Sequence, residues 1–182
     1  MRQYVILFLA LLVLCSCNSF EDEAKDQMKK TMKEWSKNSD TLKISNIKTL
    51  YVCDSLCILQ FTTNGQNSFD EWSNKKFEYA YYYTSREDGS RIYLEFLIDL
   101  EGGISAYESS VKMYNSIAED IKSGEWDKMG EWDDLDVTPY AQLRHAAEEG
   151  FPINDLKKVK DFVIYNEIRT WGAFGSRVVD KE

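Results

Sequence analysis

The chain has 182 residues and a formal net charge of −9 at pH 7. This deficit of positive charge argues against a nucleic-acid partner, because phosphate neutralisation requires lysine and arginine. The length and the 14% aromatic content predict one folded domain rather than a disordered tether.

The first seventeen residues have the organisation of an export signal. Arg2 precedes an apolar run from Tyr4 to Leu14, which is shorter than the ~20 apolar residues that a membrane-spanning helix needs. The run ends in Leu14-Cys15-Ser16-Cys17. This motif resembles the signal peptide of bacterial lipoproteins, with Leu before a small residue and then Cys. The resemblance implies removal of residues 1–16, and diacylglycerol plus an acyl chain such as palmitate on Cys17.

Residues 17–23 are expected to form an acidic tether. The sequence Asn18-Ser19-Phe20-Glu21-Asp22-Glu23 resembles the export signal after the lipidated Cys in surface-exposed lipoproteins of the Bacteroidetes. Asn18 also differs from the Asp that retains lipoproteins at the inner membrane in enteric bacteria. These resemblances imply a lipid anchor in the outer membrane, with a surface-exposed protein, or alternatively one that faces the periplasm.

Residues 24–182 are expected to form a single α+β domain. An N-terminal helix is predicted for residues 24–37, because apolar side chains recur there every three or four residues. Extended segments follow at 42–52, 57–63, 77–84 and 91–100. Since short loops join them, we expect an antiparallel sheet of about four to five strands with the helix packed on it.

The C-terminal part is expected to be mainly helical. Gly102-Gly103 is expected to close the sheet, and the capping-box spacing of Ser105 and Glu108 predicts a helix that ends at Gly124. Thr138-Pro139 predicts the start of another helix, which ends before Gly150. Residues 159–170 alternate like a strand, although a helix fits nearly as well.

Cys53 and Cys57 flank a predicted hairpin tip, and the register of that hairpin determines their chemistry. A three-residue loop places the two cysteines opposite each other, where a disulfide is feasible. A two-residue turn at Asp54-Ser55 instead pairs Cys57 with Val52 and sends the thiols to opposite faces. The second register builds the better apolar face, so we favour two free thiols over a disulfide.

Tyrosines dominate the third predicted strand. Phe77, Tyr79, Tyr81 and Tyr83 alternate and therefore share one face. We expect this face to be buried under the first helix. Tyr82, on the opposite face, is the candidate for an exposed contact with a partner.

Most of the negative charge lies in residues 99–150, which carry 13 acidic and 4 basic residues. This region suits a basic protein partner, because complementary potentials steer association. It contains two tryptophans among clustered carboxylates, and we expect either a solvated loop with both rings pinned to the core or a partner-binding loop. The candidate binding residues are Trp126, Asp127, Trp132, Asp133, Asp134 and Asp136.

Catalytic and metal-binding motifs are sparse. The sequence has one histidine, His145, which we expect at the surface, so the usual zinc site and a cysteine–histidine pair are not expected. An EF-hand starting at Asp134 fails, because Pro139 stands where glycine is required. We therefore expect no cofactor or metal and a non-enzymatic binding or interaction module. The alternatives are an inhibitor or immunity protein that neutralises a basic envelope protein, and a small carbohydrate-binding or glycan-hydrolysing protein.

Overall fold

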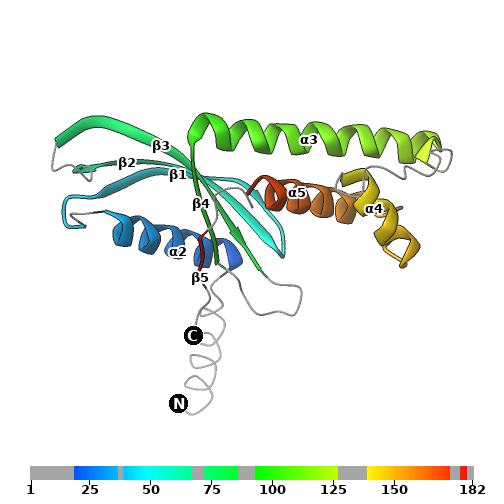
Figure 1. Ribbon diagram of the computed structural model, residues 1–182, viewed down its shortest axis with the longest axis horizontal. Coiled ribbons are helices and arrows are strands. Elements are labelled where there is room, and N and C mark those ends of the chain that lie inside the picture. The colour runs from blue at the N-terminus through cyan, green and yellow to red at the C-terminus, as the bar shows by residue number, and fades with distance from the viewer. Residues whose placement is uncertain are drawn as a thin grey trace, which may run out of the picture.

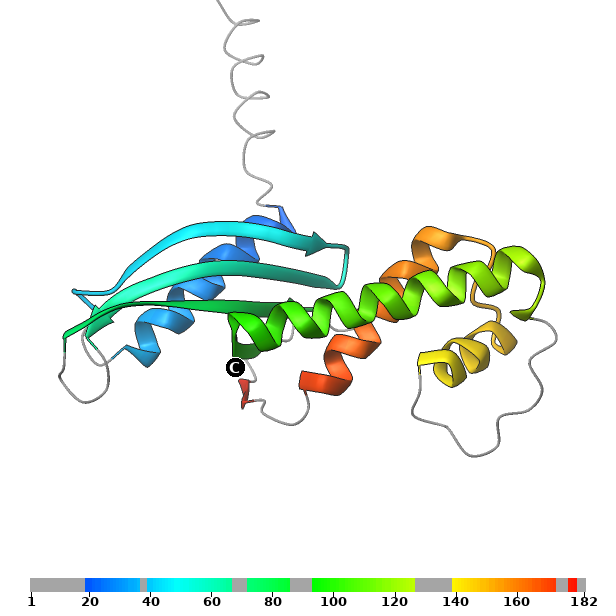
Figure 2. The same cartoon turned by 90° about the horizontal axis from the view of Figure 1, so that it is seen from above.

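The computed structural model describes residues 19–36, 39–66, 72–85, 93–126, 139–172 and 177–179. It confirms the α+β class. Helix α2 (Phe20–Trp35) covers one face of a sheet, and α3 (Leu100–Ser123) and α5 (Leu156–Gly172) lie on the other side (Figure 1). The second half of α3, α4 (Pro139–Glu148) and the first half of α5 extend beyond the sheet as a helical lobe, as the view from above shows (Figure 2).

Helix α2 begins earlier than the sequence pattern predicts. The side chain of Ser19 caps it by accepting a hydrogen bond from the backbone N–H of Asp22 at 3.2 Å, and three carboxylates in the first turn favour the positive end of the helix dipole. Residues 20–23, which were expected in the tether, therefore form the first turn of α2. Its buried stripe of Ala24, Met28 and Met32 contacts the sheet.

The sheet is antiparallel and its strands follow chain order. Three long strands form its body: β1 (Lys43–Val52), β2 (Leu56–Gln66) and β3 (Trp72–Thr84). Strand β4 (Tyr93–Asp99) pairs with β3 only from Tyr79 to Tyr82, and β5 (Arg177–Val179) adds three residues beside β4. The expected sheet of four to five strands thus consists of three long strands with a short fourth and a minimal fifth.

The tyrosines of β3 divide between the two faces of the sheet. Tyr81 and Tyr83 are fully buried beneath α2 and Tyr79 is partly buried beside them, as expected. The side chain of Phe77 lies outside the part that the structure describes. The exposed contact expected for Tyr82 is wrong, because its side chain is 1% exposed and its hydroxyl donates to the backbone carbonyl of Gly103 at 2.6 Å. The second layer of helices covers this face too.

Gly102 and Gly103 do not end the sheet but lie inside the first turn of α3. The helix begins at Leu100, so Ser105 is a helical residue and the predicted capping box is wrong. Gly103 is buried against Ala80 of β3, where a Cβ on the glycine would lie 2.1 Å from the Ala80 Cβ. A close approach of two backbones, rather than a turn, explains this glycine.

Residues 159–170 form part of helix α5, so the strand interpretation is wrong. The buried side chains of this segment are Val159, Val163, Ile164 and Ile168, a helical spacing. Val159 and Val163 join Ile117 of α3 and Leu143 of α4 in the core of the helical lobe. Ile164 and Ile168 pack on the sheet. One helix therefore contributes to two cores.

Helix α4 ends where the sequence predicts. Gly150 has φ +100°, and the N–H of Phe151 donates to the carbonyl of Ala146 at 2.8 Å, an arrangement typical of glycine-terminated helices. His145 is exposed, as expected, and lies 3.6 Å from Glu149. In the described ranges, no helix combines the length and hydropathy needed to cross a membrane.

Candidate functional site

Side chains from three elements meet where the β1–β2 hairpin reaches the helices. We call Tyr51, Tyr107, Tyr114, Lys160 and Asp161 the Tyr51 cluster. A register shift between Thr49 and Tyr51 makes this meeting possible. Thr49 lies opposite Leu59, on the α2 side, whereas Tyr51 lies opposite Ile58, on the side of α3 and α5. A bulge of this kind changes the face to which the following side chain points.

The Tyr51 cluster joins the sheet to α5 through a hydrogen bond and ring contacts. The hydroxyl of Tyr51 donates to a carboxylate oxygen of Asp161. The Lys160 Nζ lies 5.8 Å from the ring centroids of both Tyr51 and Tyr114, within cation–π range. The rings of Tyr51 and Tyr107 have centroids 6.2 Å apart. The lysine charge is therefore held between one strand and α3.

The electrostatics of the Tyr51 cluster favour attachment over catalysis. Burial, followed by the hydrogen bond to Asp161, holds the pKa of Tyr51 well above its usual range. The phenol is consequently a neutral donor at physiological pH and is not a base. In the residues that the structure describes, no group of three or more His, Cys, Asp or Glu side chains is placed to hold a metal ion.

The hairpin cysteines adopt the two-residue register that the sequence favours. Cys57 pairs with Val52, and the N–H of Cys53 donates to the carbonyl of Leu56 at 2.9 Å. Both thiols are free. Cys57 packs under α2, where burial raises its pKa to about 12, whereas Cys53 packs on the opposite side and lies 3.6 Å from the Ser55 hydroxyl. The Cys57 thiol is thus a core group and not a nucleophile.

Trp126 is the one predicted binding residue of the acidic region that lies within the described ranges. Its ring stacks on that of Tyr140, with centroids 5.9 Å apart and an interplanar angle of 21°. The Tyr140 hydroxyl contacts Asp120 at 2.8 Å and Ser116 at 3.1 Å, both on α3. These contacts pin Trp126 to the helical lobe. The other predicted residues lie outside the described ranges: Asp127, Trp132, Asp133, Asp134 and Asp136.

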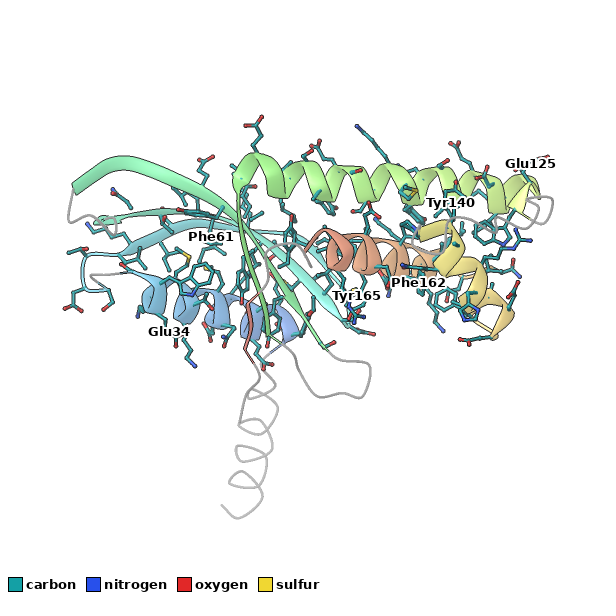
Figure 3. All side chains as sticks on the ribbon, viewed as in Figure 1. Glu34, Phe61, Glu125, Tyr140, Phe162 and Tyr165 are labelled. Carbon is teal, nitrogen blue, oxygen red and sulfur yellow. The ribbon has the colours of Figure 1, made fainter. Side chains whose placement is uncertain are left out.

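The described surface of the helical lobe carries charges of both signs. Its exposed acidic residues are Glu119, Glu125, Glu148, Glu149 and Asp155, and its exposed lysines include Lys122, Lys157 and Lys158. Figure 3 shows Glu125 at the end of α3 and Tyr140 on α4. Both lie in the helical lobe, whereas Phe61 lies between the sheet and α2. Trp126 and Pro139, which flank residues 127–138 in the sequence, therefore both belong to this lobe.

No protein-family model, curated protein or solved structure matches the chain.

Sequence reasoning missed the Tyr51 cluster. Lys160 and Asp161 precede a segment that alternates like a strand, and a strand interpretation hides which side chains share a face of α5. The spacing of Val159, Val163 and Ile164 was the available signal for a helix. Tyr51 and its hydrogen-bond partner Asp161 are 110 residues apart in the sequence. No local sequence pattern predicts a contact over that separation.

Proposed function

We propose that this protein is a lipid-anchored lipoprotein of the cell envelope that acts as a non-enzymatic interaction module for a basic protein. The anchor rests on the resemblance of Leu14-Cys15-Ser16-Cys17 to a lipoprotein signal. The acidic residues after Cys17 support an outer-membrane location with exposure at the cell surface. A periplasmic orientation is the alternative.

The observation that carries the interaction role is the acidic balance of residues 99–150, which carry 13 acidic and 4 basic residues. Glu119, Glu125, Glu148 and Glu149 of this stretch are exposed on the helical lobe, which also exposes Lys122, Lys157 and Lys158. The 127–138 segment, which adds Asp127, Asp133, Asp134 and Asp136 in the sequence, connects α3 to α4 of the same lobe. Carboxylates held close together repel one another, and a basic partner relieves this repulsion and associates faster.

Trp126 has a supporting role in this proposal. Its ring stacks on Tyr140 of the lobe, and Trp126 directly precedes the acidic segment in the sequence. Trp132 is the apolar anchor that we propose for the partner. Buried aromatic anchors dominate the energetics of many protein interfaces.

Among the alternatives, an inhibitor or immunity protein uses the same acidic surface against a basic envelope toxin or enzyme. A carbohydrate-binding role has less support, because a sugar platform needs exposed aromatic rings. Tyr81, Tyr82 and Tyr83 are all buried, so β3 does not provide one in that stretch. The partner chemistry that the charges favour is therefore protein rather than glycan.

The interaction is tested with a variant in which Asp127, Asp133, Asp134 and Asp136 are all changed to Asn. We expect the wild type to recover a basic protein from the native envelope and this variant to lose it. The matched control changes four exposed carboxylates outside the lobe to amides, Asp26, Asp40, Glu78 and Glu34, and retains the partner. Recovery should decline as salt shortens the Debye length from about 10 Å at 0.1 M to about 3 Å at 1 M. Identical partners from all three proteins would contradict the proposal.

The lipid anchor is tested separately. Wild type should incorporate a palmitate analogue and partition into detergent, and Cys17→Ser should do neither. The control Cys53→Ser leaves the proposed anchor unchanged and should behave like wild type. A mature wild-type protein without label would refute the anchor and leave the acidic surface to be judged by the partner experiment.

A further inference from the structure

We infer that the protein contacts the phospholipid surface through the part of its α2 side that carries the first turn of α2 and the tip of the β1–β2 hairpin, midway along the molecule (Figure 1). We call this part the anchored end, because α2 begins there, and define it by Phe20, Val52 and Asp54. The inference rests on the proposed lipidation of Cys17. Beyond that proposal, the inference specifies which face of the protein meets the bilayer and which face is presented to partners.

The length of chain between the lipid and the folded body carries the first step. Only Asn18 separates Cys17 from Ser19, and two residues span at most about 7 Å. Ser19 already belongs to the body, because its carbonyl accepts the N–H of Glu23 at 3.1 Å and its side chain caps α2. An acylated Cys17 therefore holds the first turn of α2 close to the headgroups.

The β1–β2 hairpin lies beside that first turn. The Thr49 hydroxyl donates to Glu21 at 2.5 Å, and Lys25 contacts the same carboxylate oxygen at 2.6 Å. The rings of Phe20 and Tyr83 have centroids 5.1 Å apart. Since Tyr83 pairs with Cys57 and Cys57 pairs with Val52, the end of β1 adjoins the start of α2.

Val52 is exposed at this junction. It lies opposite Cys57, whose side chain packs under α2, so Val52 is on the α2 side of the sheet. It is 43% exposed and is one of two large apolar side chains that are exposed among the described residues. The other, Trp35, is at the far end of α2, roughly 22 Å from Phe20 at 1.5 Å per residue. The apolar exposure near the anchor is thus a property of the hairpin tip.

The charges around the anchored end select the kind of lipid. Glu21, Asp22 and Glu23 occupy the first turn of α2 and Asp54 lies in the hairpin turn. Lys25 pairs with Glu21, so these five residues together carry a net negative charge. Negative headgroups repel such a surface, whereas zwitterionic headgroups do not. The membrane that this surface contacts is therefore composed of zwitterionic phospholipids, and the Val52 side chain inserts there beside the acyl anchor.

The layer order then determines what faces away from the membrane. Helix α3 lies on the opposite side of the sheet from α2 (Figure 1). Glu108 and Lys112 are exposed on α3 and belong to the surface presented outward. A soluble partner meets this side of the molecule first.

The experiment uses full-length lipidated protein in phosphatidylcholine vesicles, with Cys53→Ser removing the more accessible thiol. A fluorescent label is attached at Val52→Cys, at Asp54→Cys or at Glu108→Cys in separate proteins. We expect lipids that carry a spin label on the headgroup to quench the labels at 52 and 54 several-fold more than the label at 108. Adding phosphatidylglycerol should reduce the quenching at 52 and 54.

The two proposals fail in different ways in this experiment. Protein that does not float with the vesicles refutes the lipid anchor and the inference with it. Protein that floats but shows equal quenching at all three positions, or stronger quenching at 108, refutes the anchored end and leaves the lipid anchor intact. Labels at 52 and 54 act as checks on each other, because a label that disturbs one site leaves the other informative.

Discussion

Gly103 illustrates how one residue sets the distance between two layers. The missing Cβ lets α3 approach β3 so closely that the Tyr82 hydroxyl reaches the Gly103 carbonyl at 2.6 Å. Glycine inside a helix costs about 1 kcal/mol relative to alanine, which is why Gly102-Gly103 favoured a break in the sequence analysis. Tertiary contact overrides that local preference here.

We expect Gly103→Ala to destabilise the protein by about 1–3 kcal/mol, because its Cβ would overlap that of Ala80. Ser105→Ala, at an exposed position of the same helix, is the matched control and should be nearly neutral. Urea unfolding measures both. The double variant Gly103→Ala with Ala80→Gly should recover part of the loss, and strict additivity of the two single effects would contradict the proposed clash.

Cys57 makes stability depend on pH in alkaline solution. Burial raises its pKa from an ordinary value near 9 to about 12. Above pH 9 the unfolded chain loses this proton while the folded chain keeps it, so the free energy of unfolding falls as pH rises. The slope reaches at most about 1.4 kcal/mol per pH unit. Below pH 9 the contribution of Cys57 is constant.

The measurement compares denaturant unfolding of wild type and Cys57→Ala between pH 8 and pH 10. The tyrosines with a raised pKa, Tyr51, Tyr79, Tyr82 and Tyr140, begin to affect stability near pH 10, but they do so in both proteins and cancel in the comparison. The difference in unfolding free energy between the two proteins should shrink as pH rises. Parallel curves would show that the folded and unfolded thiols titrate alike.

At the scale of elements, local signals predicted those segments whose environment is simple. The apolar stripe of α2 faces one apolar surface, and Tyr81 and Tyr83 of β3 form part of that surface, so periodicity located α2 and also predicted that these two tyrosines are buried. The hairpin register followed from the choice between two turn lengths, and the apolar face selected the correct one. In each of these cases the prediction concerned only the face that packs against α2.

The same reasoning gave wrong predictions for elements that pack against two neighbours. Tyr82 was expected to be exposed because an antiparallel sheet commonly has one wet face, but α3 covers it. Helix α5 has apolar residues for the lobe and for the sheet, and the combined sequence from Phe162 to Ile168 alternates like a strand. The binding residues proposed in the acidic region stay predictions, apart from the packing of Trp126.

The Tyr51–Asp161 hydrogen bond fastens one element to another and is testable by a double-mutant cycle. Asp161→Ala should lower the unfolding free energy by about 1–3 kcal/mol, since it removes the acceptor of a half-buried phenol. Asp161→Asn retains an acceptor oxygen and should cost less. If Tyr51→Phe and Asp161→Ala are coupled, their combined effect is smaller than the sum. Additive effects would mean that the bond does not hold the hairpin to α5.

At the scale of the whole molecule, two helices are shared between the cores. Ala106 of α3 packs with the sheet and Ile117 with the helical lobe. Ile164 and Val163 of α5 divide in the same way. Continuous helices transmit the loss of packing from one core to the other, so we expect the lobe and the sheet to unfold together despite the extended shape in Figure 2.

Leu143→Ala tests this cooperativity, because Leu143 is fully buried in the lobe core on α4. Removing its side chain should cost about 2–5 kcal/mol, while Glu148→Ala on the exposed side of α4 should change little. If the molecule is one cooperative unit, hydrogen exchange of the most protected amides accelerates by the same factor in α4, in α5 and in β2. An acceleration confined to α4 and the adjoining turns, with β2 unchanged, would instead mean that the lobe opens on its own and that α3 and α5 do not couple the two cores.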